Sequence, residues 1–186
     1  MTYTTASKKR SLVSQLALSL AGVASAVLLP QVFHAIGVIS GTGAALGSAL
    51  LPMQIPVLLA GILGGPVVGL IVGLLSPVLS FAISGMPTAA LLPFMAIELG
   101  VYGLTAGLLA RTKINRFVQL LITQTAGRAA RVAAVLGVIA LFDHTQFSVS
   151  TSGAFITAGA FGILLQWALI PLLCPHLEKL VHKQYD

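Results

Sequence analysis

Residues 44–83, AALGSALLPMQIPVLLAGILGGPVVGLIVGLLSPVLSFAI, decide the fold, because this long stretch contains no charged side chain. A helix needs about 20 apolar residues to cross the hydrocarbon core of a bilayer, so the stretch is long enough for two crossings. Gly64-Gly65-Pro66 in its middle is a signal for a tight turn. The pattern predicts a helical hairpin in a membrane, with helices over residues 44–64 and 66–83.

The rest of the chain has the same apolar character. Of its 186 residues, 57% are hydrophobic and only 8% are charged, whereas soluble domains carry about 25% charged residues. Further apolar runs predict spans over residues 11–29, 89–110, 117–142 and 154–174. We therefore expect an all-α integral membrane protein, a bundle of six transmembrane helices that forms a single membrane domain over residues 1–186.

The basic residues indicate the orientation. With six spans, the Lys and Arg residues outside them fall on one side of the membrane, and the three loops on the other side have none. Because cytoplasmic loops are enriched in Lys and Arg, both termini are predicted to be cytoplasmic. The net charge of +6 comes from these short clusters and not from one basic face, which argues against nucleic-acid binding. The residues concerned are Lys8, Lys9, Arg10, Arg111, Lys113, Arg116, Lys179 and Lys183.

The N-terminal run has an alternative interpretation. Lys8–Arg10, the apolar run and Ala24-Ser25-Ala26 together resemble a secretory signal peptide with a cleavage site. The apolar run continues through Val27–Leu29, however, which favours a retained first span.

Three charged residues lie inside predicted spans: Glu98, Arg128 and Arg131. Each costs at least about 2.5–3.5 kcal/mol at the centre of a bilayer, so each needs a partner or a wet cavity. From the outer helix ends, Glu98 is roughly 13 Å deep, Arg131 about 16 Å and Arg128 about 21 Å. Glu98 and Arg131 are thus near one level, where we expect them to be able to pair, and the two arginines share a helix face.

Two arginines against one glutamate leave a surplus positive charge. This surplus either binds a substrate anion, for which a guanidinium fork suits a carboxylate, or one arginine simply satisfies helix carbonyls. Candidate neighbours in a substrate site are Gln54 between two prolines, Gln124, Tyr102 and His34, the last in the first outer loop. Gln166 and Trp167 are predicted to serve packing or interfacial anchoring.

Enzymatic signatures are missing from the sequence. It has no H-E-x-x-H, G-x-S-x-G or G-x-x-x-x-G-K-[ST] motif, so we expect no enzyme, no metal and no cofactor. Small residues recur at four-residue spacing, which brings helices into close contact. Most such pairs predict packing within the protein, but Ala17/Ala21 on the first helix is a candidate surface for docking a partner protein.

An ordered set of segments resembles the substrate-binding S components of energy-coupling factor (ECF) vitamin transporters. The resemblance covers most of the chain and is closest to the pantothenate type, whose carboxylate suits the arginine surplus. Niacin, folate and other precursors fit the same charge. One departure is Gln54, where relatives carry histidine. The matching segments are Leu51–Gly61, Gly65–Gly69, Ser84–Pro87, Ala96–Leu104 and Ala126–Arg128.

The resemblance implies a vitamin site that opens outward beneath the loop between the first two helices, in the plasma membrane of a prokaryote. It also implies that Ala17 and Ala21 dock on a transmembrane coupling protein that carries two ATPase subunits. The S component is thought to topple in the membrane to deliver its ligand.

Three other classes of function remain open from the residues alone. A stand-alone secondary transporter or channel for a small anion would show an inverted repeat, and no convincing one is visible. An intramembrane enzyme would use Glu98 with His34 or His144, but both histidines are predicted at a different depth. A purely structural adaptor would retain no ligand.

Overall fold

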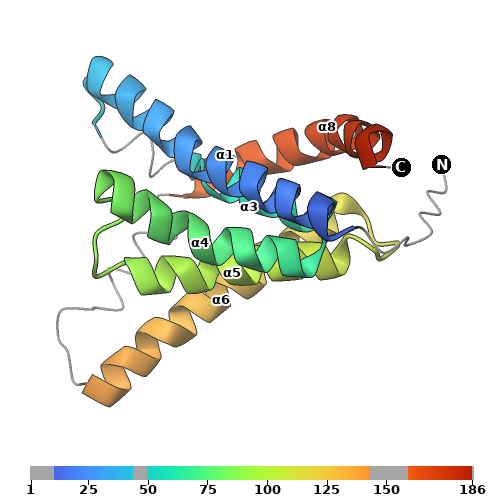
Figure 1. Ribbon diagram of the computed structural model, residues 1–186. Helices are drawn as coiled ribbons and strands as arrows, with labels where there is room; N and C mark the ends of the chain where they lie inside the picture. The colour runs from blue at the N-terminus through green and yellow to red at the C-terminus, as the bar shows by residue number, and fades with distance from the viewer. Residues whose placement is uncertain (1–10, 44–49, 143–158, 186) are drawn as a thin grey trace.

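The computed structural model describes residues 11–43, 50–142 and 159–185. Within these ranges the chain is helical and has no strand, which confirms the all-α prediction for this part of the protein (Figure 1). Lys8–Arg10, the predicted helical residues 44–49 and 154–158, and His144 lie outside the described residues. The helices are α1 (Leu12–Ile39), α3 (Gln54–Gly64), α4 (Pro66–Ser84), α5 (Leu92–Leu109), α6 (Arg116–Phe142) and α8 (Ala160–Tyr185).

The helices alternate in direction along the chain, so that α1 begins and α8 ends at the same end of the bundle (Figure 1). Arg111 and Lys113 lie at this end, between α5 and α6. Arg116 is the first residue of α6, and Lys179 is near the end of α8. We call it the basic end.

Four of the described helices are long and apolar enough to cross a membrane: α1, α4, α5 and the Phe161–Val181 part of α8. Helix α3 has only 11 residues, about 16 Å of helix. Helix α6 has 27 residues but includes Arg128 and Arg131. The count of six spans therefore stays a prediction, as does the cytoplasmic placement of the termini.

The predicted hairpin between α3 and α4 is confirmed. Gly65 ends α3 with a φ of 93°, a left-handed value that favours glycine, and its N–H donates to Gly61 O at 2.9 Å. Pro66 occupies the first turn of α4, where the missing N–H would have no helical partner.

Glycines bring α4 and α5 into backbone contact. A methyl group on Gly69 or Gly103 would collide with the carbonyl of the other, and one on Gly73 would collide with the Leu99 backbone. Close approach through small residues is the main source of helix association in a bilayer, where lipid tails remove most of the hydrophobic drive. Two of the small-residue pairs with four-residue spacing, Gly69/Gly73 and Gly103/Gly107, therefore serve packing within the protein, as expected for most such pairs.

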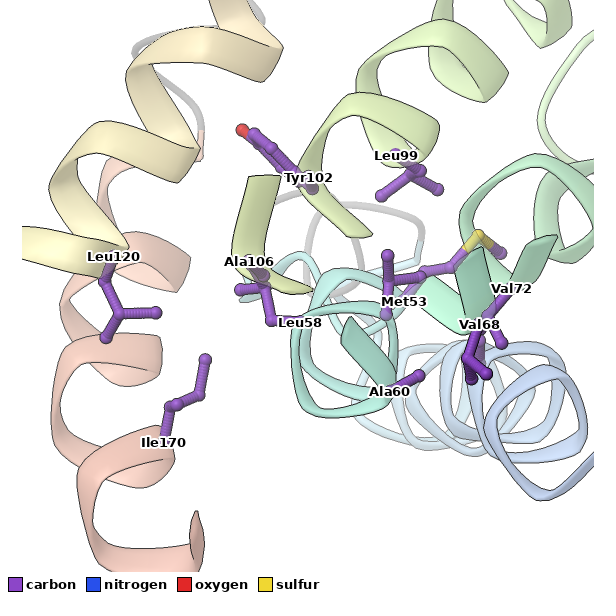
Figure 2. Packing of buried hydrophobic residues seen from close by; sticks show 12 residues of the cluster. Met53, Leu58, Ala60, Val68, Val72, Leu99, Tyr102, Ala106, Leu120 and Ile170 are labelled. Carbon is purple, nitrogen blue, oxygen red and sulfur yellow. The ribbon is translucent and has the colours of Figure 1, made fainter. Parts of the chain in front are cut away.

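The apolar core lies between α3, α4 and α5, and α6 and α8 contribute to one side of it (Figure 2). Leu58 and Val72 are completely buried in it. Leu120 from α6 and Ile170 from α8 point toward Leu58 and Ala106 (Figure 2). This core holds α3, the short helix, in the middle of the bundle.

Two predicted boundaries are wrong. Helix α1 does not end at Leu29 but passes Pro30 and continues to Ile39, because a proline removes only one backbone donor and membrane helices tolerate it. His34 is therefore in a helix and not in a loop. Helix α8 continues through Pro171 and Pro175 to Tyr185, well beyond the predicted end at residue 174.

A break in the helix precedes α3. Helix is interrupted at Leu51–Met53 and resumes at Gln54. Leu51 has a φ of 48°, and the residue before a proline is disfavoured in the right-handed helical region, so Pro52 accounts for the break. The Gln54 N–H still donates to Leu51 O at 3.1 Å. The helix is thus broken beside Pro52, one of the two prolines that flank Gln54.

Candidate functional site

An ion pair joins α5 and α6. Arg131 Nη1 donates to Glu98 Oε2 at 2.8 Å, and the Tyr102 hydroxyl donates to Glu98 Oε1 at 3.0 Å. The Glu98 side chain is only 4% exposed and that of Arg131 is 21% exposed. The pairing expected from their similar depths is present.

Small residues make this contact between the two helices possible. A methyl group on Gly127 of α6 would collide with the ring of Tyr102, so only glycine lets α6 approach α5 here. Tyr102 lies at the margin of the apolar core with its hydroxyl turned toward α6 (Figure 2). Both oxygens of Glu98 are thereby occupied by donors from described residues.

Arg128 occupies the same face of α6, one turn from Arg131. Its guanidinium lies near the Tyr102 hydroxyl, and its buried Nε has no hydrogen-bond partner among the described residues. A methyl group on Gly159 would lie 3.0 Å from Arg128 Nη2 and 2.6 Å from Leu51 Cδ1. The Arg128 side chain therefore reaches the place where the break before α3 meets the start of α8.

A chain of buried side-chain amides begins one turn away on α6. Trp167 Nε1 donates to Gln124 Oε1 at 2.8 Å, Gln124 Nε2 donates to Gln166 Oε1 at 2.8 Å, and Gln166 Nε2 donates to Gln54 Oε1 at 2.9 Å. These bonds tie α3, α6 and α8 together. We call these four residues the amide chain.

The structure brings most of the predicted site residues into two adjoining groups. Glu98, Tyr102 and Arg131 form one, and Gln54 and Gln124 belong to the other. His34 does not join either group. It is on α1, which packs against α3 and α4 and not against the interface between α5 and α6.

Sequence reasoning missed two residues of this region. Gln166 and Trp167 were assigned to packing or anchoring, yet Gln166 is fully buried and bonds to two other glutamines. The signal for Gln166 was an amide inside an apolar helix, since a polar group in that setting needs a partner on another helix. The sequence alone did not identify the partner.

The described part of the site has a cation that no carboxylate of the described residues balances. Arg131 is balanced by Glu98, whereas no ion pair of the described residues uses Arg128. A guanidinium whose charge is not matched by a nearby carboxylate attracts a carboxylate or another oxyanion, to which it can donate in parallel.

These features define a class: an all-helical membrane protein with a charged, hydrogen-bonded site buried between its helices. Residues 11–174 match the family described as ECF transporter, substrate-specific component. The chain belongs to this family. No curated protein matches the chain, and no solved structure matches it.

Membership in this family defines the general role of the protein. Substrate-specific components of ECF transporters bind small substrates and work with an ECF module, and the family is one of transporter subunits and not of enzymes.

Proposed function

We propose that this protein is the high-affinity capture subunit for a small vitamin or vitamin precursor, with pantothenate as the best candidate. It works with a separate transmembrane coupling protein and an ATPase pair to import that substrate. One observation carries the proposal: two guanidinium groups and one carboxylate lie together among the described residues of α5 and α6, and the Nε of Arg128 is buried without a partner there.

The energetics favour a substrate anion at Arg128. A buried donor without a partner costs about 1–3 kcal/mol, and more when it is charged. A carboxylate that enters the site removes this penalty and adds a charge-assisted hydrogen bond. Pantothenate has one carboxylate together with amide and hydroxyl groups, so the amide chain beside Arg128 suits its uncharged part. Niacin, folate and other carboxylate precursors share only the carboxylate with pantothenate.

The expected membrane topology supports the same role. We propose that the chain forms one membrane domain of six spans with both ends in the cytoplasm of a prokaryote, so that the basic end is internal. On α1, Gly22 and Ala26 face α3 and α4 or are fully buried, whereas Ala21 is exposed and Ala17 is half-buried. This supports Ala17 and Ala21 as the surface that docks on the coupling protein.

The test is equilibrium binding of radiolabelled pantothenate to the purified protein in nanodiscs, together with a panel of other carboxylate vitamins. Arg128→Gln is expected to weaken binding by about 10- to 100-fold, the range for a charged hydrogen bond of about 1.5–3 kcal/mol. Arg111→Gln is the matched control, because Arg111 is exposed at the basic end, and it should bind as the wild type does. Wild-type affinity in both Arg128→Gln and Arg131→Gln would refute the anion site.

Uptake into liposomes separates the proposal from its alternative, a stand-alone secondary transporter or channel for a small anion. The proposed capture subunit moves no vitamin across the bilayer unless the coupling protein, the ATPases and ATP are present. Accumulation driven by an ion gradient, with this protein alone in the liposomes, would favour the alternative.

A further inference from the structure

The amide chain has a direction that follows from its chemistry. An indole N–H is a donor only, so the atom of Gln124 that faces Trp167 must be its carbonyl oxygen. Gln124 then presents its NH₂ group to Gln166, which must accept with its own oxygen, and Gln166 in turn donates to the oxygen of Gln54. The three bonds, at 2.8, 2.8 and 2.9 Å, have this polarity.

The chain ends on the NH₂ group of Gln54. Among the hydrogen bonds of the described residues, Gln54 uses its oxygen, and none of them uses its Nε2. Gln54 is only 5% exposed, and its Nε2 is not among the fully buried side-chain atoms that lack a partner, so this donor still borders accessible space. An amide donor that protein surrounds on most sides, and that no acceptor of the described residues uses, is a place for a bound acceptor group.

The position of Gln54 adds to this argument. It is the first residue of α3, where helix N–H groups and the helix dipole favour negative charge or acceptor oxygens. Leu51, one turn earlier, borders Gly159 together with the guanidinium of Arg128. The break that directly precedes Gln54 and the Arg128 cation therefore lie in the same region, at the start of α8.

We propose that Trp167 and Gln166 are positioning residues that fix the Gln54 amide with its NH₂ group free, so that the substrate group that meets Gln54 is a hydrogen-bond acceptor. The inference rests on the proposed function and makes it more specific. The substrate presents a carbonyl, hydroxyl or carboxylate oxygen to Gln54, and a ligand that offers a protonated amine there is rejected. Trp167 and Gln166 act through Gln54 and need not touch the substrate.

The direction of the amide chain is tested in the ligand-free protein by replacing glutamine with glutamate at two of its positions, Gln54 and Gln124. Both variants should lose thermal stability as the pH rises, because ionising a buried carboxyl group is costly. Gln54→Glu keeps an oxygen that accepts from Gln166 at any pH, so this cost is its only loss. Gln124→Glu retains a donor toward Gln166 only while it is protonated, so its stability should fall more steeply as the pH rises. Trp167 is the only tryptophan, and its fluorescence should shift in Gln124→Glu and not in Gln54→Glu.

Binding of radiolabelled pantothenate then tests the assignment of the substrate group. Gln166→Leu releases the Gln54 amide and should weaken binding about tenfold, the factor for one hydrogen bond of about 1.4 kcal/mol. In the wild type, saturating ligand should change Trp167 fluorescence through the amide chain. In Gln166→Leu it should not, because this variant lacks the hydrogen bonds that join Gln54 to Gln124. Gln119→Leu, which removes a glutamine buried near the basic end of α6, is the matched control and should keep the wild-type affinity and response.

Several results would overturn the inference. If Gln54→Glu loses stability with rising pH as steeply as Gln124→Glu does, or more steeply, the chain runs in the other direction. If Gln166→Leu keeps the wild-type affinity, or Gln119→Leu loses as much, then Gln166 has no positioning role. Failure of the wild type to bind any vitamin in the panel would overturn the proposed function and the substrate assignment with it. The pH profiles and the fluorescence would still decide the direction of the chain.

Discussion

Removing both members of the Glu98–Arg131 pair should destabilise the protein less than removing either one. In Arg131→Met, the Glu98 carboxylate, which is 4% exposed, keeps the Tyr102 hydroxyl at 3.0 Å as its side-chain donor among the described residues. Breaking a buried pair by removing one partner costs about 3–5 kcal/mol, because it leaves a buried charge uncompensated. Glu98→Leu should cost somewhat less, about 3 kcal/mol, because Arg131 is 21% exposed and reaches water more easily.

The double variant Glu98→Leu/Arg131→Met contains no buried charge at this position. Apolar replacement of a whole buried pair is often neutral, so the remaining loss is the hydrogen bond of Tyr102, about 1 kcal/mol. The assay is the free energy of unfolding of the ligand-free protein in mixed micelles with increasing denaturing detergent. The pair would have no coupling, and the reasoning would be refuted, if the double variant lost as much stability as the two single variants together.

Gly103→Ala should destabilise the protein by about 2 kcal/mol or more, since a methyl group there collides with the backbone of α4. Gly137→Ala on α6 meets open space and should stabilise by up to about 1 kcal/mol. Arg116→Gln breaks the bond to Glu178 at 2.7 Å, and because these side chains are 32% and 38% exposed, the loss should be only about 0.5–1 kcal/mol and should shrink with salt. Ala21→Leu should keep vitamin binding and lose co-purification with the ATPase pair.

Each of these predictions has a contrary outcome. Equal effects of the two glycine substitutions in thermal unfolding would mean that the backbone contact between α4 and α5 does not matter. A salt-independent loss in Arg116→Gln would contradict the role of charge in that pair. Retention of the ATPase pair by Ala21→Leu would remove this face of α1 from the docking surface.

The parts of the fold that were predictable from sequence are those encoded locally. Gly64-Gly65-Pro66 specifies the hairpin by backbone chemistry alone, and the predicted 66–83 helix differs from the observed Pro66–Ser84 by one residue. Pairing of Glu98 with Arg131 was also predictable, because a charge inside a membrane needs a partner and few candidates exist. These inferences required only counting along the helices.

The parts that were missed depend on contacts between distant segments. Whether Pro30 ends a helix is decided by the surrounding protein, so His34 was placed in a loop that is in fact helical. Gln166 bonds to Gln54, which is 112 positions away in the chain, and no local pattern indicates that partner. Likewise, a helix that passes both Pro171 and Pro175 cannot be distinguished locally from one that stops at them.

The contact between Gly69 and Gly103 has a consequence for motion. Where two backbones touch without side chains between them, neither helix can slide or rotate against the other without a steric collision. Helices α4 and α5 therefore behave as one rigid unit. Gly61 of α3 lies against the Gly103 carbonyl in the same way, so any rearrangement during a transport cycle must leave these three helices together and take place where the other helices meet them.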